Sequence, residues 1–96
     1  MSEVKLNTEK NRFELDVEGA TAVIEFRKIE PNILDLIHTE VPEALSGKGI
    51  ASKLVLGALN YIRSNNLKLI PSCSFVQSYM NKHQEWNDLL LEENRK

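Results

Sequence analysis

The sequence has 96 residues, of which 42% are hydrophobic and 27% are charged, and its formal net charge at pH 7 is −2. This length predicts one domain over residues 1–96, and the composition is typical of a folded protein rather than a disordered or fibrous one. The small negative charge offers no basic surface to nucleic acid or to an anionic membrane, and no stretch approaches the roughly 20 apolar residues that a membrane-spanning helix needs.

Two further features predict a cytoplasmic location. The polar start "MSEVKLNTEKNR" does not have the pattern of a signal peptide. The one cysteine, Cys73, has no partner for a disulfide within the chain, which fits a reducing compartment.

The first half of the chain has the two-residue period of β-strands. In "RFELDV", Phe13, Leu15 and Val17 alternate with charged residues, as in a strand with one buried face. Glu18 and Gly19 supply a turn, and the next segment, "TAVIEFRKI", is rich in the β-branched and aromatic residues that strands favour. Strands are expected at residues 12–17, at 21–29 and, after a turn at 31–32, at 33–41, with a weaker one at 4–6. Short turns between consecutive strands predict an antiparallel meander.

From Gly49 the period changes to that of a helix. Apolar residues recur at positions 50, 54, 58 and 62, with others beside them at 51, 55 and 59, whereas Lys53, Asn60 and Arg63 lie elsewhere on the helical wheel. This pattern predicts an amphipathic helix that runs to about residue 64. The following "LKLIP", residues 67–71, predicts a short strand, which a helical crossover usually makes parallel to the strand before the helix.

Two further helices are expected near the end of the chain. Residues 74–83 predict one of them, with Ser72 or Ser74 as its N-cap. Residues 85–91 predict the other, with Trp86 as the anchor of this tail.

The stretch "LSGKGIA", residues 45–51, lies between the last strand of the meander and the first helix. Its amides and the positive end of the helix dipole converge on one spot, where an anion is favoured. Gly47 and Gly49 let the backbone approach a phosphate without a side chain in the way, and a pyrophosphate is the usual occupant of such a turn. A glycine-rich turn that only changes the direction of the chain explains the same residues. The stretch matches neither the phosphate-loop pattern nor the dinucleotide pattern, whose last glycine is replaced by Ser52.

The segment "VPEALSGKGIASKLV", between a strand and an amphipathic helix, resembles the coenzyme A-binding core of the GNAT superfamily of N-acetyltransferases. The superfamily signature is Arg or Gln, two residues, Gly, one residue, then Gly or Ala. Gly49 and Ala51 match it, and Ser46 stands at the position of the Arg or Gln. With the later "PSCSFVQSYMNKH", the chain is similar over about residues 12–86 to a family of minimal acetyltransferases that lack the two helices walling the acceptor site.

The resemblance implies an α/β fold of GNAT type, in which an antiparallel meander is followed by a helix, a parallel strand and C-terminal helices. It also identifies acetyl-CoA, or coenzyme A, as the cofactor. The residues implied to bind it are Thr39, Glu40, Val41, Ser46, Gly47, Lys48, Gly49, Ile50, Ala51, Cys73, Tyr79 and His83. The amides of residues 39–41 would polarise the thioester carbonyl and pair with the pantetheine arm. Lys48 is either a charge near the phosphates or a solvated loop residue.

Three residues are candidates for catalysis. In the minimal family that the chain resembles, the cysteine at the position of Cys73 is proposed as catalytic with a companion at His38, and Cys73 also lies near a helix N-terminus that favours a thiolate. His38 is then the base for a bound amine or the base that activates Cys73 for transient acetylation. Tyr79 stands seven residues after Ser72, the spacing at which many GNAT proteins place Asn and then Tyr, and is the candidate general acid.

Each of these residues also has a purely structural interpretation. Cys73 is then a small buried hydrophobic residue, His38 a core histidine that joins two strands through hydrogen bonds, and Tyr79 a packing residue. His83 is interpreted as a helix C-cap or a residue at the cofactor edge, and not as a metal ligand, because no second ligand lies at metal spacing.

Two functions from different classes follow. The first is an acetyl-CoA-dependent N-acetyltransferase that passes an acetyl group to an unidentified amine of a protein or a small molecule. The second is a coenzyme A-binding or protein-interaction module with little or no catalysis. The pair of Cys73 and His38 favours the first, because a pure binding module has no chemical use for either residue. The sequence leaves the acceptor and the oligomeric state open, and it is compatible with a monomer.

Overall fold

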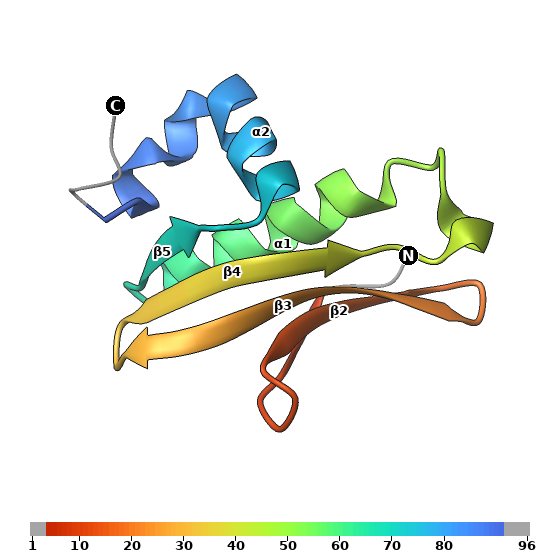
Figure 1. Ribbon diagram of the computed structural model, residues 1–96, viewed down its shortest axis with the longest axis horizontal. Helices are drawn as coiled ribbons and strands as arrows, with labels where there is room; N and C mark the ends of the chain where they lie inside the picture. The colour runs from red at the N-terminus through yellow and green to blue at the C-terminus, as the bar shows by residue number, and fades with distance from the viewer. Residues whose placement is uncertain (1–3, 92–96) are drawn as a thin grey trace.

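The computed structural model describes residues 4–91, which form a five-stranded sheet with helix α1 (Ile50–Ser64) against one face (Figure 1). The strands are β1 (Lys5–Asn7), β2 (Arg12–Val17), β3 (Ala20–Glu30), β4 (Ile33–Glu40) and β5 (Lys68–Pro71), in this order across the sheet. Neighbouring strands from β1 to β4 are antiparallel, and β5 is parallel to β4. The predicted meander with a following helix and parallel strand is confirmed.

A tight turn at Glu18 and Gly19 joins β2 to β3. Both residues have positive φ, 51° and 82°, which is the left-handed backbone that a two-residue hairpin turn requires. The pair Val17 and Ala20 closes the hairpin on either side of this turn. The predicted turn is therefore confirmed, and it carries the Glu18 side chain to the end of the hairpin.

A bulge interrupts the pairing of β4 with β3. Leu36 pairs with Phe26, but the next pair joins His38 to Glu25, so Ile37 is an extra residue in β4. Side chains alternate between the two faces along a strand, and an extra residue reverses that alternation. Beyond the bulge, each side chain of β4 therefore lies on the face of the sheet opposite to the one that regular alternation from Leu36 would give.

Helix α1 packs its apolar stripe against the sheet, as its period predicts. The buried residues of the helix are Ile50, Leu54, Val55, Ala58, Leu59 and Ile62. The buried residues of β2, β3 and β4 that join them in one core are Phe13, Leu15, Ala22, Ile24, Phe26, Leu34 and Leu36. Each large apolar side chain in such a core stabilises the fold by about 1.5–3 kcal/mol.

The remaining helical segments of the described chain are η1 (Glu43–Leu45), α2 (Ser74–Lys82) and η2 (Gln84–Leu89). The N-cap of α2 is Cys73, so the prediction of Ser72 or Ser74 is wrong. The reason is tertiary, because the Cys73 amide donates to the carbonyl of Leu36, which holds Cys73 in extended backbone just before the helix.

The tail forms a 3₁₀ helix, η2, where an α-helix was expected at residues 85–91. Leu90 forms a parallel bridge with Leu69 of β5, and this pairing draws the chain out of helical geometry. Trp86 is 7% exposed, and the Arg63 guanidinium lies 4.3 Å from its ring centroid. Arg63 also donates to the carbonyl of Glu85 at 3.1 Å. The prediction that Trp86 anchors the tail is confirmed.

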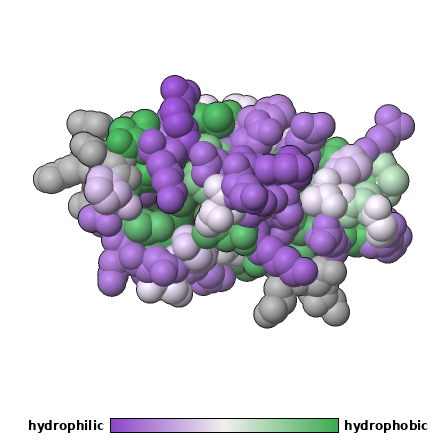
Figure 2. Space-filling view, turned by 90° about the horizontal axis from the view of Figure 1, so that it is seen from below, coloured by the Kyte–Doolittle hydropathy of each residue, from purple (hydrophilic) through white to green (hydrophobic). Residues whose placement is uncertain are grey.

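The face of the molecule seen from below is mostly hydrophilic (Figure 2). Hydrophobic side chains on this face lie in small patches between the hydrophilic ones. Among residues 4–91, no helix has the length and apolar character needed to cross a membrane.

Candidate functional site

Strands β4 and β5 pair over only the first half of β4. Their register ends with Leu36 opposite Pro71, whereas β4 continues to Glu40 with β3 as its partner. Figure 1 shows β4 running on past the point where the chain leaves β5 for α2. The last backbone hydrogen bond between the two segments runs from the Cys73 amide to the Leu36 carbonyl, at 2.8 Å. Residues 37–40 therefore form an unpaired edge of β4, which no described strand contacts on the β5 side.

Three residues that the sequence assigns to the pantetheine arm lie at the end of this unpaired edge. Thr39 and Glu40 close β4, and the half-buried Val41 follows the strand. The backbone groups of a strand edge are donors and acceptors for any amide-containing chain that lies alongside.

The Cys73 thiol lies against Thr39 where the two strands diverge. Its Sγ atom is 3.2 Å from Oγ1 of Thr39, and Cys73 is 9% exposed. Burial is the largest influence and raises the pKa of the thiol. The Thr39 hydroxyl and the backbone amides of Val76, Phe75 and Thr39 outweigh it, so the pKa of Cys73 lies below its ordinary value of 9.0. These hydrogen bonds stabilise the thiolate although Cys73 is largely buried.

His38 and Thr39 lie on opposite faces of the sheet. Beyond the bulge, Thr39 pairs with the buried Ile24 and shares the core face with Cys73. The His38 side chain is 56% exposed on the other face, with Nε2 3.6 Å from Oε1 of Glu40. The interpretation of His38 as a core histidine joining two strands is therefore wrong. The structure brings His38 and Cys73 to neighbouring segments but to different faces of β4.

The turn before α1 presents its backbone amides. Gly47 and Gly49 have φ of 78° and 70°, and a Cβ atom on either would meet nothing within 4 Å. Gly49 is the N-cap of α1, and no side chain caps this end of the helix. Within residues 4–91, the amides of residues 47–52 donate no well-formed hydrogen bond to another residue. The turn fits an anionic group, because backbone N–H donors and the positive end of the α1 dipole point into the same open space.

The side chains of this turn are engaged elsewhere. Nζ of Lys48 lies 3.1 and 3.3 Å from the carboxylate oxygens of Glu18 in the β2–β3 turn, so Lys48 is not simply a solvated loop residue. The Ser46 hydroxyl donates to the carbonyl of Glu43 at 2.9 Å. Ile50 is buried and Ala51 is half-buried. In this geometry the contribution of residues 46–51 to an anion comes from the backbone.

Tyr79 and His83 stack on one side of α2, with ring centroids 4.2 Å apart and planes inclined by 27°. Burial raises the pKa of Tyr79, and the negative charge of Glu85 raises it further. The phenol is therefore protonated at neutral pH, as a general acid must be. His83 is the C-cap of α2, as predicted, with Nδ1 3.9 Å from Oε2 of Glu85. No group of three or more His, Cys, Asp or Glu side chains among residues 4–91 could hold a metal ion.

The Thr39 hydroxyl is the part of the site that the sequence did not predict. Regular alternation from Leu34 and Leu36 would turn His38, and not Thr39, toward the core. The bulge at Ile37 reverses this order, and neither glycine nor proline marks it in the sequence. No local signal in the sequence identifies the contact between Thr39 and Cys73.

Comparison with known proteins gives the same family as the motifs. The family model described as GCN5-related N-acetyl-transferase matches residues 12–89. Protein NATD1 of Mus musculus is 32% identical over 82 residues, which cover 83% of this chain and 74% of that protein. Protein NATD1 of Gallus gallus is 31% identical over 83 residues, which cover 84% and 76% of the two chains.

A solved structure agrees with these sequence matches. The solution structure of a GCN5-like protein from Staphylococcus aureus is 35% identical and superposes with a TM-score of 0.70. The match covers 93% of this chain and 87% of the other. The sheet order, the helical crossover and the sequence matches agree, and the chain belongs to the family of GCN5-related N-acetyltransferases.

Proposed function

We propose that this chain transfers the acetyl group of acetyl-CoA to the nitrogen of an amine. The observation that carries the proposal is the Cys73 thiol, 3.2 Å from the Thr39 hydroxyl at the point where β4 and β5 diverge. The unpaired edge of β4 continues from this point to the chain segment that leads into the glycine turn. Membership of the family supports the same reaction class.

Two backbone elements would hold acetyl-CoA. The amides of residues 47–52 are the donors suited to its pyrophosphate, with Gly47 and Gly49 leaving the space in front of them open. The unpaired edge of β4, residues 37–40, offers backbone partners to the amide groups of the pantetheine arm. When bound, acetyl-CoA supplies an acetyl group activated as a thioester.

The opposite placement of His38 and Cys73 gives the two residues separate tasks. Thr39 and the amides at the start of α2 lower the pKa of the Cys73 thiol, and His38, on the other face of the sheet, is not placed to take the thiol proton. The Cys73 thiolate attacks the thioester carbonyl, and the bond between the acetyl carbon and the coenzyme A sulfur breaks. The Tyr79 phenol donates a proton to the departing thiolate and later regains one from solvent. The amine then displaces Sγ from the acetyl carbon, which restores the Cys73 thiolate.

His38 is suited to the last proton transfer. Its exposed imidazole lies on the solvent side of β4 and on the other face of the sheet from Cys73, so the proton that the amine nitrogen loses would reach it through water. The carboxylate of Glu40, 3.6 Å away, lies beside the positive charge that this creates. An exposed base of this kind suits an acceptor too large for an enclosed site.

Binding is tested first by calorimetric titration of acetyl-CoA into the wild type, Gly49→Val and Gly19→Val. Both glycines have positive φ and free space around a Cβ atom, so the two variants carry matched backbone strain. We expect saturable binding to the wild type and to Gly19→Val, and its loss in Gly49→Val. An absence of binding to the wild type at millimolar acetyl-CoA would overturn the proposal.

Transfer is tested with peptide and polyamine acceptors and with intact-mass measurement of the protein. We expect Cys73→Ala to lose both the acetyl adduct and the transfer, and His38→Gln to keep the adduct while losing the transfer. Binding of acetyl-CoA without an adduct or transfer to any acceptor would favour the second function, a coenzyme A-binding module without catalysis.

A further inference from the structure

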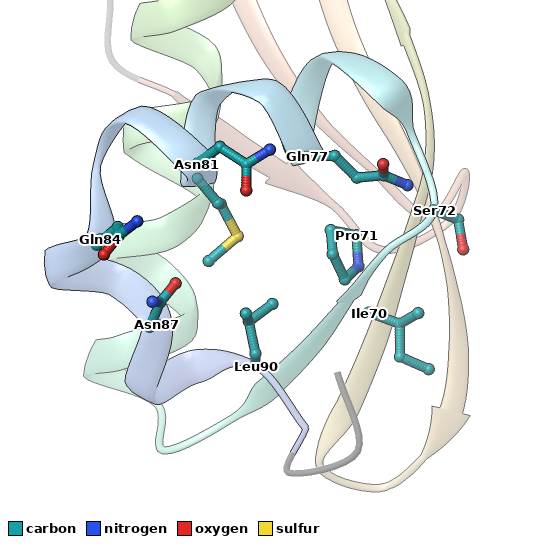
Figure 3. A pocket seen from close by; sticks show the side chains of 9 residues that line it. Ile70, Pro71, Ser72, Gln77, Asn81, Gln84, Asn87 and Leu90 are labelled. Atoms are coloured by element: carbon teal, nitrogen blue, oxygen red, sulfur yellow. The ribbon is translucent and has the colours of Figure 1, made fainter. Parts of the chain in front are cut away.

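A pocket of about 290 Å³ lies between β5, α2 and η2 (Figure 3). It is lined by Ile70, Pro71, Ser72, Gln77, Met80, Asn81, Gln84, Asn87 and Leu90. Gln77 and Asn81 are one helical turn apart and lie on one side of α2, whereas Tyr79, two positions from each, lies on the other. The pocket is therefore separate from the side of α2 that carries the Tyr79–His83 stack.

Four carboxamides surround the pocket. Figure 3 shows Gln77 and Asn81 on α2 and Gln84 and Asn87 on η2, arranged around a common hollow. Each carboxamide has two N–H donors and a carbonyl acceptor. None of the four side chains makes a hydrogen bond with another residue in the described part of the chain. Their donors and acceptors are available to a ligand, which would replace water at each of them.

Apart from Ser72, the remaining lining is apolar, and it is without charge. Met80 and Leu90 are 3% and 6% exposed, and Ile70 and Pro71 add half-buried hydrocarbon from β5. No lining residue carries a charge, so a charged group would gain no opposite charge in the pocket. Apolar walls with a few convergent polar groups are the usual character of a small-ligand pocket, and this one is at the small end of the usual range.

The free edge of β5 is a poor site for a ligand that binds as an added strand. Pro71 has no amide proton to offer along this edge, and the Leu69 carbonyl already accepts a hydrogen bond from the Leu91 amide at 3.4 Å. The carboxamide side chains, rather than an added strand, are therefore the polar groups on which recognition in the pocket rests.

We propose that this pocket is a second binding site, which takes an uncharged peptide segment with an amide group beside an apolar side chain. A ligand amide pairs reciprocally with a carboxamide, since each group donates an N–H and accepts at a carbonyl. The ligand's apolar side chain lies against Met80 and Leu90. The proposal does not depend on acetyl transfer, because it uses neither Cys73 nor the glycine turn.

The test is a titration of the full chain, labelled with ¹⁵N, with N-acetyl-leucine N-methylamide. The side-chain NH₂ signals of Gln77, Asn81, Gln84 and Asn87 report the pocket directly, and the amides of Gly47 and Gly49 report the turn. We expect saturable shifts at the four carboxamides and none at the two glycines. An absence of shifts at millimolar probe, or shifts confined to the glycines, would overturn the proposal.

Matched probes and variants test the chemistry of recognition. N-acetyl-leucine methyl ester lacks one N–H, and leucine N-methylamide carries a positive charge, so each is expected to bind at least about fivefold more weakly. Asn81→Asp keeps the shape but removes the NH₂ donor, and we expect it to weaken binding about fivefold or more. Asn60→Asp, at an exposed position of α1, is the control that leaves binding unchanged. Equal binding of all three probes, or equal binding to both variants, contradicts recognition of an uncharged amide.

Discussion

Substitution of Thr39 by Val tests how the site holds the Cys73 thiolate. The change keeps the branched shape of the side chain but removes the hydroxyl 3.2 Å from Sγ. Because Cys73 is 9% exposed, water cannot fully replace this partner. The pKa of Cys73 should therefore rise in Thr39→Val, while Thr39→Ser, which keeps the hydroxyl, should change it less.

The same substitution should affect stability in a pH-dependent way. A thiol whose pKa is lowered in the folded state stabilises the fold fully above its unfolded-state pKa, near 9.0. That stabilisation is lost as the pH falls through the folded-state pKa. A hydrogen bond to a charged group contributes about 1.5–3 kcal/mol, against about 0.5–1.5 kcal/mol between neutral groups. Thr39→Val should therefore lower the unfolding free energy by about 1 kcal/mol more in alkaline solution than at neutral pH.

Urea unfolding followed by tryptophan fluorescence measures this difference, because the chain has 1 tryptophan, Trp86, which is 7% exposed. Lysine and tyrosine residues also titrate in alkaline solution, so the comparison is repeated in a Cys73→Ala background. The pH-dependent part should vanish there. If Thr39→Val has the same effect at both pH values, or keeps its pH dependence without Cys73, the hydroxyl does not stabilise the thiolate and the reasoning fails.

Three further substitutions test other contacts. Asp35 in β4 is 8% exposed, and its Oδ1 has no hydrogen-bond partner among the described residues. Asp35→Leu should therefore raise the unfolding free energy by about 1–3 kcal/mol. Lower stability of the variant in urea would contradict this. Arg63→Ala removes the cation over the Trp86 ring and should lower the unfolding free energy by about 0.5–1.5 kcal/mol. The tryptophan fluorescence should also shift to the red. An unchanged emission spectrum would count against Arg63 as the residue that holds Trp86 in place. Glu18→Gln removes the carboxylate that pairs with Lys48. Calorimetry at low salt should then show acetyl-CoA binding up to about fivefold tighter. This gain must disappear when Lys48 is also replaced by Ala.

The elements that depend on local pattern are the ones that the sequence predicts well. The alternation in "RFELDV" is sufficient for β2, and the recurrence of apolar residues from Ile50 to Ile62 is sufficient for α1. The ends of α2 and η2 depend instead on distant partners. Cys73 takes the N-cap position because its amide meets Leu36, 37 positions earlier in the numbering, and η2 ends where Leu90 meets β5. Residue preferences alone cannot predict such ends.

The glycine turn shows the same division between local and distant information. Positive φ at Gly47 and Gly49 could be predicted, because few other residues adopt that backbone readily. The partner of Lys48 could not, since Glu18 reaches it from a hairpin 30 residues away. The sequence predicted a positive charge beside the turn, and the structure neutralises that charge with a carboxylate. The amides, rather than the lysine, are then the main attraction for an anion.

The bulge at Ile37 decides which side chain meets Cys73. Without it, the alternation set by Leu36 would turn His38 toward the core and leave Thr39 on the outer face. With it, the buried position beside the thiol holds a neutral hydroxyl, and the imidazole stays in solvent. A hydroxyl can stabilise the thiolate without titrating near neutral pH, and an exposed imidazole can exchange its proton with water between turnovers. In the proposed mechanism, one extra residue in a strand thus separates the hydroxyl beside the nucleophile from the imidazole that acts as the base.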